Sequence, residues 1–202
     1  MLFVATVPAA SSPCSAQEIA ATAIVSPAMQ QAPADVGLSR VDRGFSPPTV
    51  QEIRWHAPCT PNIVALYGGR TLATGSGLML SMEGGSTLHV RHDPTPTIDP
   101  EPPHPEWKDH RFAGSAALRA GAWRVGAWVA PDGTTQIARY RAGDKATPIT
   151  LMTSAQPIVG LFYLGLPDAV GGTLFFAQRL APSHYRMVSM NWSEEGLRTP
   201  GR

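Results

Sequence analysis

The chain has 202 residues, of which 43% are hydrophobic and 15% are charged, and its formal net charge is +1. This length suits one domain with a tail, since domains commonly run to about 100–200 residues. The hydrophobic content is that of a globular protein and argues against disorder throughout the chain. The near-neutral charge and the scattered basic residues argue against a nucleic-acid binder, which needs a dense basic surface to contact phosphates.

Residues 1–16 contain two of the three features of a secretory signal peptide. A short apolar core from Leu2 to Val7 is followed by small residues, whereas a basic stretch before the core is missing. The pattern fits a truncated signal peptide whose true start lies upstream of Met1. It predicts an exported protein, either periplasmic or secreted.

The same segment has a second interpretation, as a short helix in a cytoplasmic protein. Ser15 and Glu18 have the spacing of a capping box before residues 19–25, and Pro27 would end that helix. No uninterrupted apolar stretch approaches the roughly 20 residues that span a bilayer, so no transmembrane segment is expected. Residues 26–48 are rich in Ala, Pro, Ser and Gln and are predicted to form a linker.

The two cysteines, Cys14 and Cys59, allow one disulfide. If the signal peptide is removed, Cys14 is lost, and Cys59 is then expected to be a buried free thiol. Two cysteines so far apart do not form a zinc motif.

A single β-rich domain is predicted over residues 49–195, followed by a frayed tail at residues 196–202. Short apolar or alternating runs recur in this region with turn residues between them. This pattern predicts an all-β fold, an antiparallel sandwich or partly closed barrel of roughly 8–11 short strands. At most one short helix is expected, over residues 113–120. Residues 158–164 are apolar on both faces, which favours a central strand covered on both sides.

Two hairpins are predicted from turn chemistry. The clearest joins residues 122–130 to residues 134–141 through Pro131-Asp132-Gly133, in which proline presets φ and glycine accepts a positive φ. Another joins residues 77–82 to residues 86–91 through a glycine-containing turn.

The stretch from residue 89 to residue 110 is the most unusual in composition, because it holds four of the six histidines interleaved with prolines and acids. Imidazole and carboxylate groups are ligands for zinc, manganese or iron. No known ligand spacing is matched, so an exposed polyproline-like loop is the favoured interpretation, and a segment that docks on a partner is a further alternative. The candidate metal ligands are His89, His92, Asp93, His104 and His110.

Aromatic residues offer a second kind of candidate site. Trp123 and Trp128 are an odd number of residues apart, so a regular strand directs them to opposite faces. Exposed rings on a sheet can bind peptides or glycans, and Trp107 and Trp128 are the candidates for such a surface. The alternative is that both faces of the sheet are covered. His184 opens the last predicted strand and is expected to be a sheet residue that finds a hydrogen bond at the edge.

The sequence contains no nucleophile elbow, P-loop, dinucleotide-binding fingerprint or Cys-x-x-Cys motif. We therefore expect a non-enzymatic binding or interaction module of a bacterial-type cell envelope, with a protein, peptide or glycan as partner. No cofactor is expected for such a module. The alternative is a metal-assisted hydrolase that takes a divalent metal with ligands from residues 89–110.

Overall fold

The computed structural model describes residues 23–25, 30–31, 36–55, 63–68, 77–81, 86–91, 107–118, 122–141, 143, 147–165 and 171–193. Of this part, 67% is strand and none is helix. Two antiparallel sheets face each other without closing into a barrel, so the predicted all-β sandwich is confirmed. Among the strands of this part, β1 to β3 have only two or three residues each, and the other eleven are longer.

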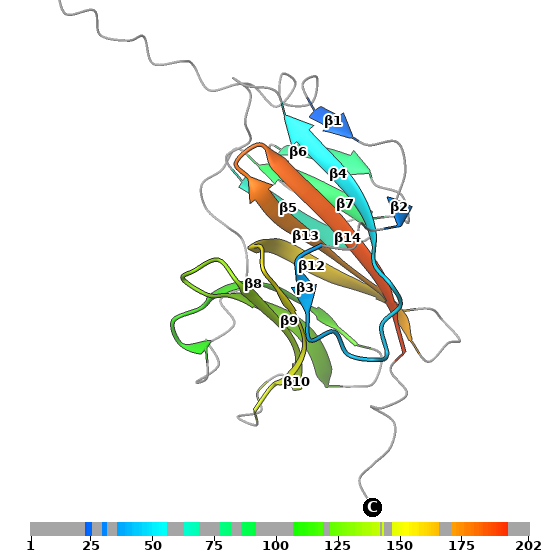
Figure 1. Ribbon diagram of the computed structural model, residues 1–202, viewed down its shortest axis with the longest axis vertical. Helices are drawn as coiled ribbons and strands as arrows, with labels where there is room; N and C mark the ends of the chain where they lie inside the picture. The colour runs from blue at the N-terminus through cyan, green and yellow to red at the C-terminus, as the bar shows by residue number, and fades with distance from the viewer. Residues whose placement is uncertain are drawn as a thin grey trace, which may run out of the picture.

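The larger sheet, sheet A, has six strands, and β13 lies in its interior between β12 and β14 (Figure 1). In order across the sheet, its strands are β1 (Ala23–Val25), β4 (Thr49–Trp55), β14 (His184–Trp192), β13 (Gly172–Ala181) and β12 (Ile158–Gly165), with β2 (Gln30–Gln31) also paired to β4.

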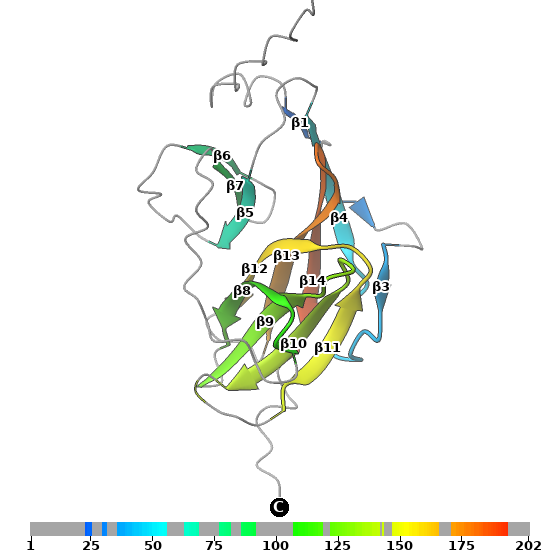
Figure 2. The ribbon, with the colours of Figure 1, turned by 90° about the vertical axis from the view of Figure 1, so that its left-hand side faces the viewer.

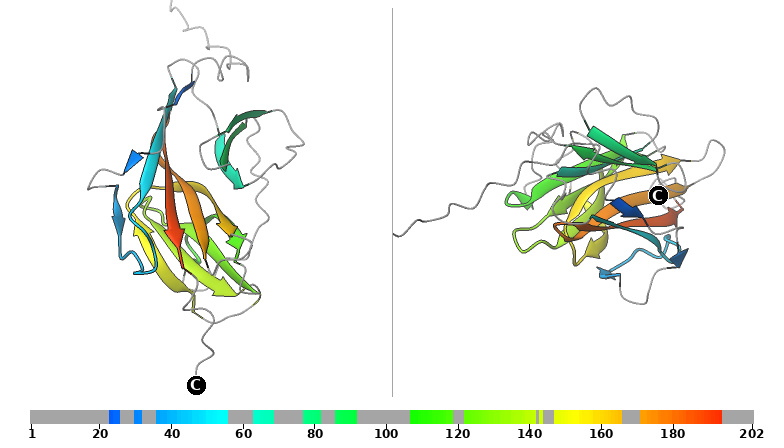
Figure 3. Two further views of the ribbon diagram at one scale, coloured as in Figure 1. Left: turned by 90° about the vertical axis from the view of Figure 1, so that its right-hand side faces the viewer. Right: turned by 90° about the horizontal axis from the view of Figure 1, so that it is seen from above.

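The second sheet, sheet B, has five strands and lies in front of β12 to β14 in the view of Figure 2. In order, its strands are β3 (Leu38–Ser39), β11 (Ile149–Ser154), β10 (Thr135–Arg141), β9 (Trp123–Val129) and β8 (Arg111–Ala117). A small third sheet, sheet C, consists of β5 (Ile63–Gly68), β7 (Ser86–Arg91) and β6 (Gly77–Ser81). Its strand β5 lies against β12 and β13 (Figure 3).

The main hydrophobic core fills the space between sheets A and B. Leu174 and Phe176 of β13 point into it from one side, and Val125 and Ile137 of sheet B point into it from the other. All four side chains are fully buried. Burial of apolar area on this scale is the main stabilising contribution to such a fold.

Both predicted hairpins are confirmed. Strands β9 and β10 pair antiparallel around the turn, where Gly133 has φ of 90° and its N–H donates to the carbonyl of Ala130 at 2.9 Å. The Asp132 carboxylate accepts from the backbone N–H of Thr134 at 2.9 Å, which closes the turn from its other side. Strands β6 and β7 likewise pair antiparallel, with Leu80 opposite Leu88.

Two predicted elements differ in the structure. The helix expected over residues 113–120 is wrong, because residues 111–117 form strand β8. Pairing with β9 satisfies the backbone of this segment, and this tertiary pairing overrides the local preference of its alanines for helix. The strand over residues 158–164 is not central: β12 is a hydrogen-bonding edge of sheet A. Strands β8 and β5 lie against it, and Ile158 and Leu161 are buried, whereas Leu164 near its end is 46% exposed.

Part of the N-terminal segment packs on the sandwich. Residues 23–25 are strand rather than the end of a helix, and residues 30–31 and 38–39 are also strands paired with the sheets. Val36, within the expected linker, is buried in the core. Residues 1–22, and with them the signal-peptide hypothesis, lie outside the described residues, as does the tail at 196–202.

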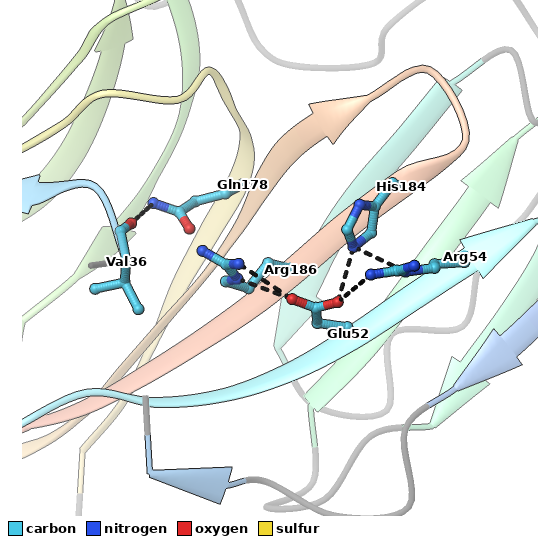
Figure 4. A network of polar contacts seen from close by, with 6 residues as sticks. All are labelled: Val36, Glu52, Arg54, Gln178, His184 and Arg186. Carbon is cyan, nitrogen blue, oxygen red and sulfur yellow. Dashed lines mark hydrogen bonds and ion pairs between the residues drawn. The ribbon is translucent and has the colours of Figure 1, made fainter. Parts of the chain in front are cut away.

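A buried polar network ties the two sheets together. Gln178 of β13 has no exposed surface, and its Nε2 donates to the Val36 carbonyl at 3.0 Å (Figure 4). The same Nε2 also donates to Ser154 Oγ at 3.0 Å. Ser154 Oγ also donates to the carbonyl of Gln156 at 2.8 Å. These bonds connect sheet A, the end of β11 and the segment before β3.

In the part of the chain that the structure describes, there is no helix with the length and apolar character that crossing a membrane requires.

Replacing Gln178 with Met tests this network. The substitution keeps the side-chain volume but leaves the Val36 carbonyl without its donor, so we expect a loss of about 1–3 kcal/mol in the free energy of unfolding. Urea denaturation of the purified chain measures this loss. Thr173→Ala on the same strand is the control, because its hydroxyl bond to Asn191 is solvent-exposed and its removal should change stability by less than about 0.5 kcal/mol. Equal effects of the two substitutions would contradict the role given to Gln178.

Candidate functional site

Four ionisable residues from two neighbouring strands of sheet A form one group. The register of β4 and β14 places His184 opposite Arg54 and Arg186 opposite Glu52. Side chains two residues apart on a strand, and those directly opposite across a pair, point to the same face. These four side chains therefore share one face of sheet A, and we call them the charged square (Figure 4).

The charged square lies where the core of the sandwich ends. Further along the same two strands, Val50 is opposite Val188, and both are buried in the core. Sheet A extends past sheet B at the end where β4 and β14 carry the square (Figure 1). The face that is apolar opposite sheet B is thus charged where sheet B no longer covers it.

Glu52 is the centre of the square and accepts from all three of its neighbours. Its Oε1 lies 3.1 Å from Nη2 and 3.4 Å from Nε of Arg186. Its Oε2 lies 3.0 Å from Nη2 of Arg54 and 2.9 Å from Nε2 of His184. Both carboxylate oxygens are therefore occupied by cationic or ring N–H groups, which fixes the four side chains relative to one another.

These contacts set the ionisation of the carboxylate. Burial alone raises the pKa of Glu52, but the hydrogen bonds from the two arginines and His184 outweigh burial and lower the pKa from 4.5 to about 2. Glu52 is thus ionised at neutral pH and can only accept hydrogen bonds.

The ionised carboxylate in turn determines where His184 carries its proton. Nε2 of His184 lies 2.9 Å from Glu52 Oε2 and 3.3 Å from Nε of Arg54. A ring nitrogen that carries a proton can donate to the carboxylate but cannot accept from the guanidinium. We therefore assign the proton to Nε2, which leaves Nδ1 as the acceptor atom of the ring.

The charged square is open to solvent and carries an excess of positive charge. The exposed fraction of the side chain is 63% for Arg54, 31% for Glu52, 21% for His184 and 15% for Arg186. Two guanidinium groups and one carboxylate leave a net charge of +1 with His184 neutral, and +2 with His184 protonated. The guanidinium of Arg54 is therefore held by Glu52 on one side and remains accessible to solvent on the other.

The arrangement holds one carboxylate and its three hydrogen-bonding neighbours on one face of sheet A. The pair of Glu52 and His184 resembles a carboxylate that orients a catalytic base, but a base needs a substrate or nucleophile within hydrogen-bond reach. Among the described residues, His184 contacts no hydroxyl or thiol group. The square provides a fixed pattern of hydrogen-bond donors around one ionised carboxylate, whose charge the two arginines balance.

The structure describes the side chain of one predicted metal ligand, His110. Its backbone N–H donates to the Trp107 carbonyl at 2.9 Å, and its Nδ1 is buried without a hydrogen-bond partner among the described residues. His89 lies in β7 opposite Ala65 and Met79. The described residues contain no group of three or more His, Cys, Asp or Glu that could hold a metal ion.

The remaining predicted ligands, His92, Asp93 and His104, lie outside the described residues, as do Cys14 and Cys59. The metal-site hypothesis for residues 89–110 and the disulfide therefore stay predictions.

Trp107 and Trp128 are buried, with exposed fractions of 9% and 2%, so they do not form the exposed surface that we considered. Their ring centroids are 4.6 Å apart, and Tyr140 packs edge-on against Trp128 at 5.2 Å. Gly126 makes room for this cluster, because a Cβ added there would lie 2.7 Å from Cη2 of Trp128. Trp128 is thus covered on the face of sheet B that points away from Val125 and Ile137.

Sequence reasoning anticipated one member of the charged square. His184 was expected to find a hydrogen bond at the edge of the sheet; it does bond to Glu52, but on β14, an interior strand between β4 and β13. Glu52, Arg54 and Arg186 were not predicted. Their signal was present, because both strands carry two ionisable residues at alternate positions next to buried apolar ones.

Comparison of this chain with protein-family models, with curated proteins and with solved structures found no match.

Acid titration of stability tests the ionisation of Glu52. Since its pKa is lowered from 4.5 to about 2, its stabilising contribution is present above pH 4.5 and is lost as the pH falls towards 2. We expect Glu52→Gln to be less stable than the wild type at pH 6, by an amount on the order of 1–2 kcal/mol after solvent screening. This difference should shrink as the pH is lowered to 2.

Thermal unfolding of both chains between pH 6 and pH 2 measures that difference. Asp109→Asn is the control for loss of one negative charge, because Asp109 is exposed and forms no salt bridge with the described residues. A difference between wild type and Glu52→Gln that stays constant down to pH 2 would contradict the assigned ionisation.

Proposed function

We propose that the chain is a non-enzymatic binding module of the cell envelope and that the charged square is part of its recognition surface. The observation that carries this proposal is the partly exposed, internally hydrogen-bonded group of four ionisable side chains beyond the end of the core. Side chains held on paired strands are placed more accurately than side chains on loops, which favours specific recognition.

The charge of the square indicates the kind of partner. Its net charge is positive, and Arg54 keeps guanidinium donors that Glu52 does not occupy. Guanidinium groups bind carboxylates through two parallel hydrogen bonds. The partner therefore presents carboxylate groups, as acidic peptides and acidic glycans do. A fixed charge pattern of this type contributes mostly to specificity and to the rate of association.

Binding of immobilised acidic peptides and acidic glycans tests the proposal. For each acidic peptide or glycan that the wild type binds, we expect Arg54→Ala to raise the dissociation constant about tenfold. This is the effect of losing one charge-assisted hydrogen bond at an exposed site. Arg54 is largely exposed, so its removal should leave the fold intact, which circular dichroism checks. Arg43→Ala, which removes an exposed arginine that is not part of the square, is the matched control and should bind as the wild type does.

Two results would overturn the proposal. One is equal binding by Arg54→Ala and the wild type. The other is turnover of nitrophenyl ester or phosphate substrates in the presence of zinc or manganese, which would favour the metal-assisted hydrolase instead.

Export is the second part of the proposal and rests on the signal-like pattern of residues 1–16. Mass spectrometry of the chain isolated from its native cells tests this part. Loss of the apolar core and the small residues after it supports export, whereas a chain that still begins at Met1 contradicts signal processing.

A further inference from the structure

A second cationic group lies on sheet B, where β9 begins and β10 ends. Arg141 is directly opposite Trp123, and Arg139 points to the same face because it lies two residues before Arg141. The Cζ atom of Arg141 lies 4.9 Å from the centroid of the Trp123 ring, and that of Arg139 lies 5.4 Å from it. Both guanidinium groups thus lie within cation–π distance of one indole ring.

These two like charges lie beside the same indole ring without a counter-charge in the described part of the chain. The salt bridges there all involve Glu52, which belongs to sheet A. The Nε atom of Arg139 is buried and has no hydrogen-bond partner among the described residues. A buried charged donor without an acceptor is unfavourable, and so is the repulsion between two neighbouring guanidinium groups.

We propose that Arg139 and Arg141 form a binding site for an oxyanion, a phosphoryl or carboxyl group of a small ligand, beside Trp123. An oxyanion bound beside the ring offsets the positive charge of both guanidinium groups and accepts hydrogen bonds from their N–H donors. The half-buried Trp123 ring supplies an apolar wall that keeps water from one side of the ion pair. Two arginines and one tryptophan on adjacent strands therefore provide both the charge and the partial desolvation that a weak anion site needs.

This site is independent of the charged square. It lies on sheet B, draws on β9 and β10, and shares no residue with β4 or β14. The two proposals can therefore succeed or fail separately, and a substitution at one site serves as a further control for the other.

Titration of the full chain with inorganic phosphate and with acetate tests the site, with chloride adjusted to keep the ionic strength constant. Nuclear magnetic resonance follows the indole N–H of Trp123 and the Nε–H groups of both arginines. We expect saturable shifts with a dissociation constant on the order of 1–10 mM for at least one anion. Preference for phosphate identifies a phosphoryl group in the natural ligand, and preference for acetate identifies a carboxyl group.

The decisive variant is Arg141→Gln, because Arg141 is exposed and its loss should not unfold the chain. We expect at least fivefold weaker anion binding. Arg124→Gln is the matched control: Arg124 is next to Trp123 in sequence but points to the opposite face, opposite Tyr140. Its binding should stay within about twofold of the wild type. Shifts that do not saturate with either anion, or equal losses in both variants, would overturn the proposal.

Discussion

The amide of Gln178 is the contact on which the arrangement of the two sheets depends. It is fully buried on an interior strand of sheet A, yet both hydrogen bonds from its Nε2 go to groups outside that sheet. Apolar packing between two sheets is non-directional and tolerates sliding. Hydrogen bonds to Ser154 and to the Val36 carbonyl are directional, so they select one relative position of the sheets.

That position decides where the functional surfaces lie. Sheet A extends beyond sheet B at the end that carries the charged square (Figure 1). If sheet B were shifted along sheet A by a few residues, it would cover Glu52 and Arg186, and burial of the ionised network would carry a large desolvation penalty. The charged square therefore also acts against the wrong alignment of the sheets.

Local chemistry was sufficient to predict the hairpins and the fold class, whereas contacts between distant segments were not predictable. The turn at Pro131-Asp132-Gly133 is encoded within a few residues, and it is present as expected. Glu52 and His184 are 132 residues apart, so their contact requires the register of β4 on β14, which no local pattern specifies. The segment over residues 113–120 was misassigned for the same reason, since only its pairing with β9 makes it a strand.

The short strands β1 and β2 protect one margin of the molecule. They pair with opposite ends of β4, at residues 53–55 and 49–50, along the side that would otherwise be the open edge of sheet A. An open edge offers unpaired backbone groups to other chains and promotes aggregation. Proteolytic trimming that stops before residue 23 would keep these pairings, whereas trimming through residue 31 would leave β4, the strand that carries Glu52 and Arg54, as an open edge. The segment that follows the signal-like sequence thus covers an edge of sheet A and should reduce aggregation of the chain.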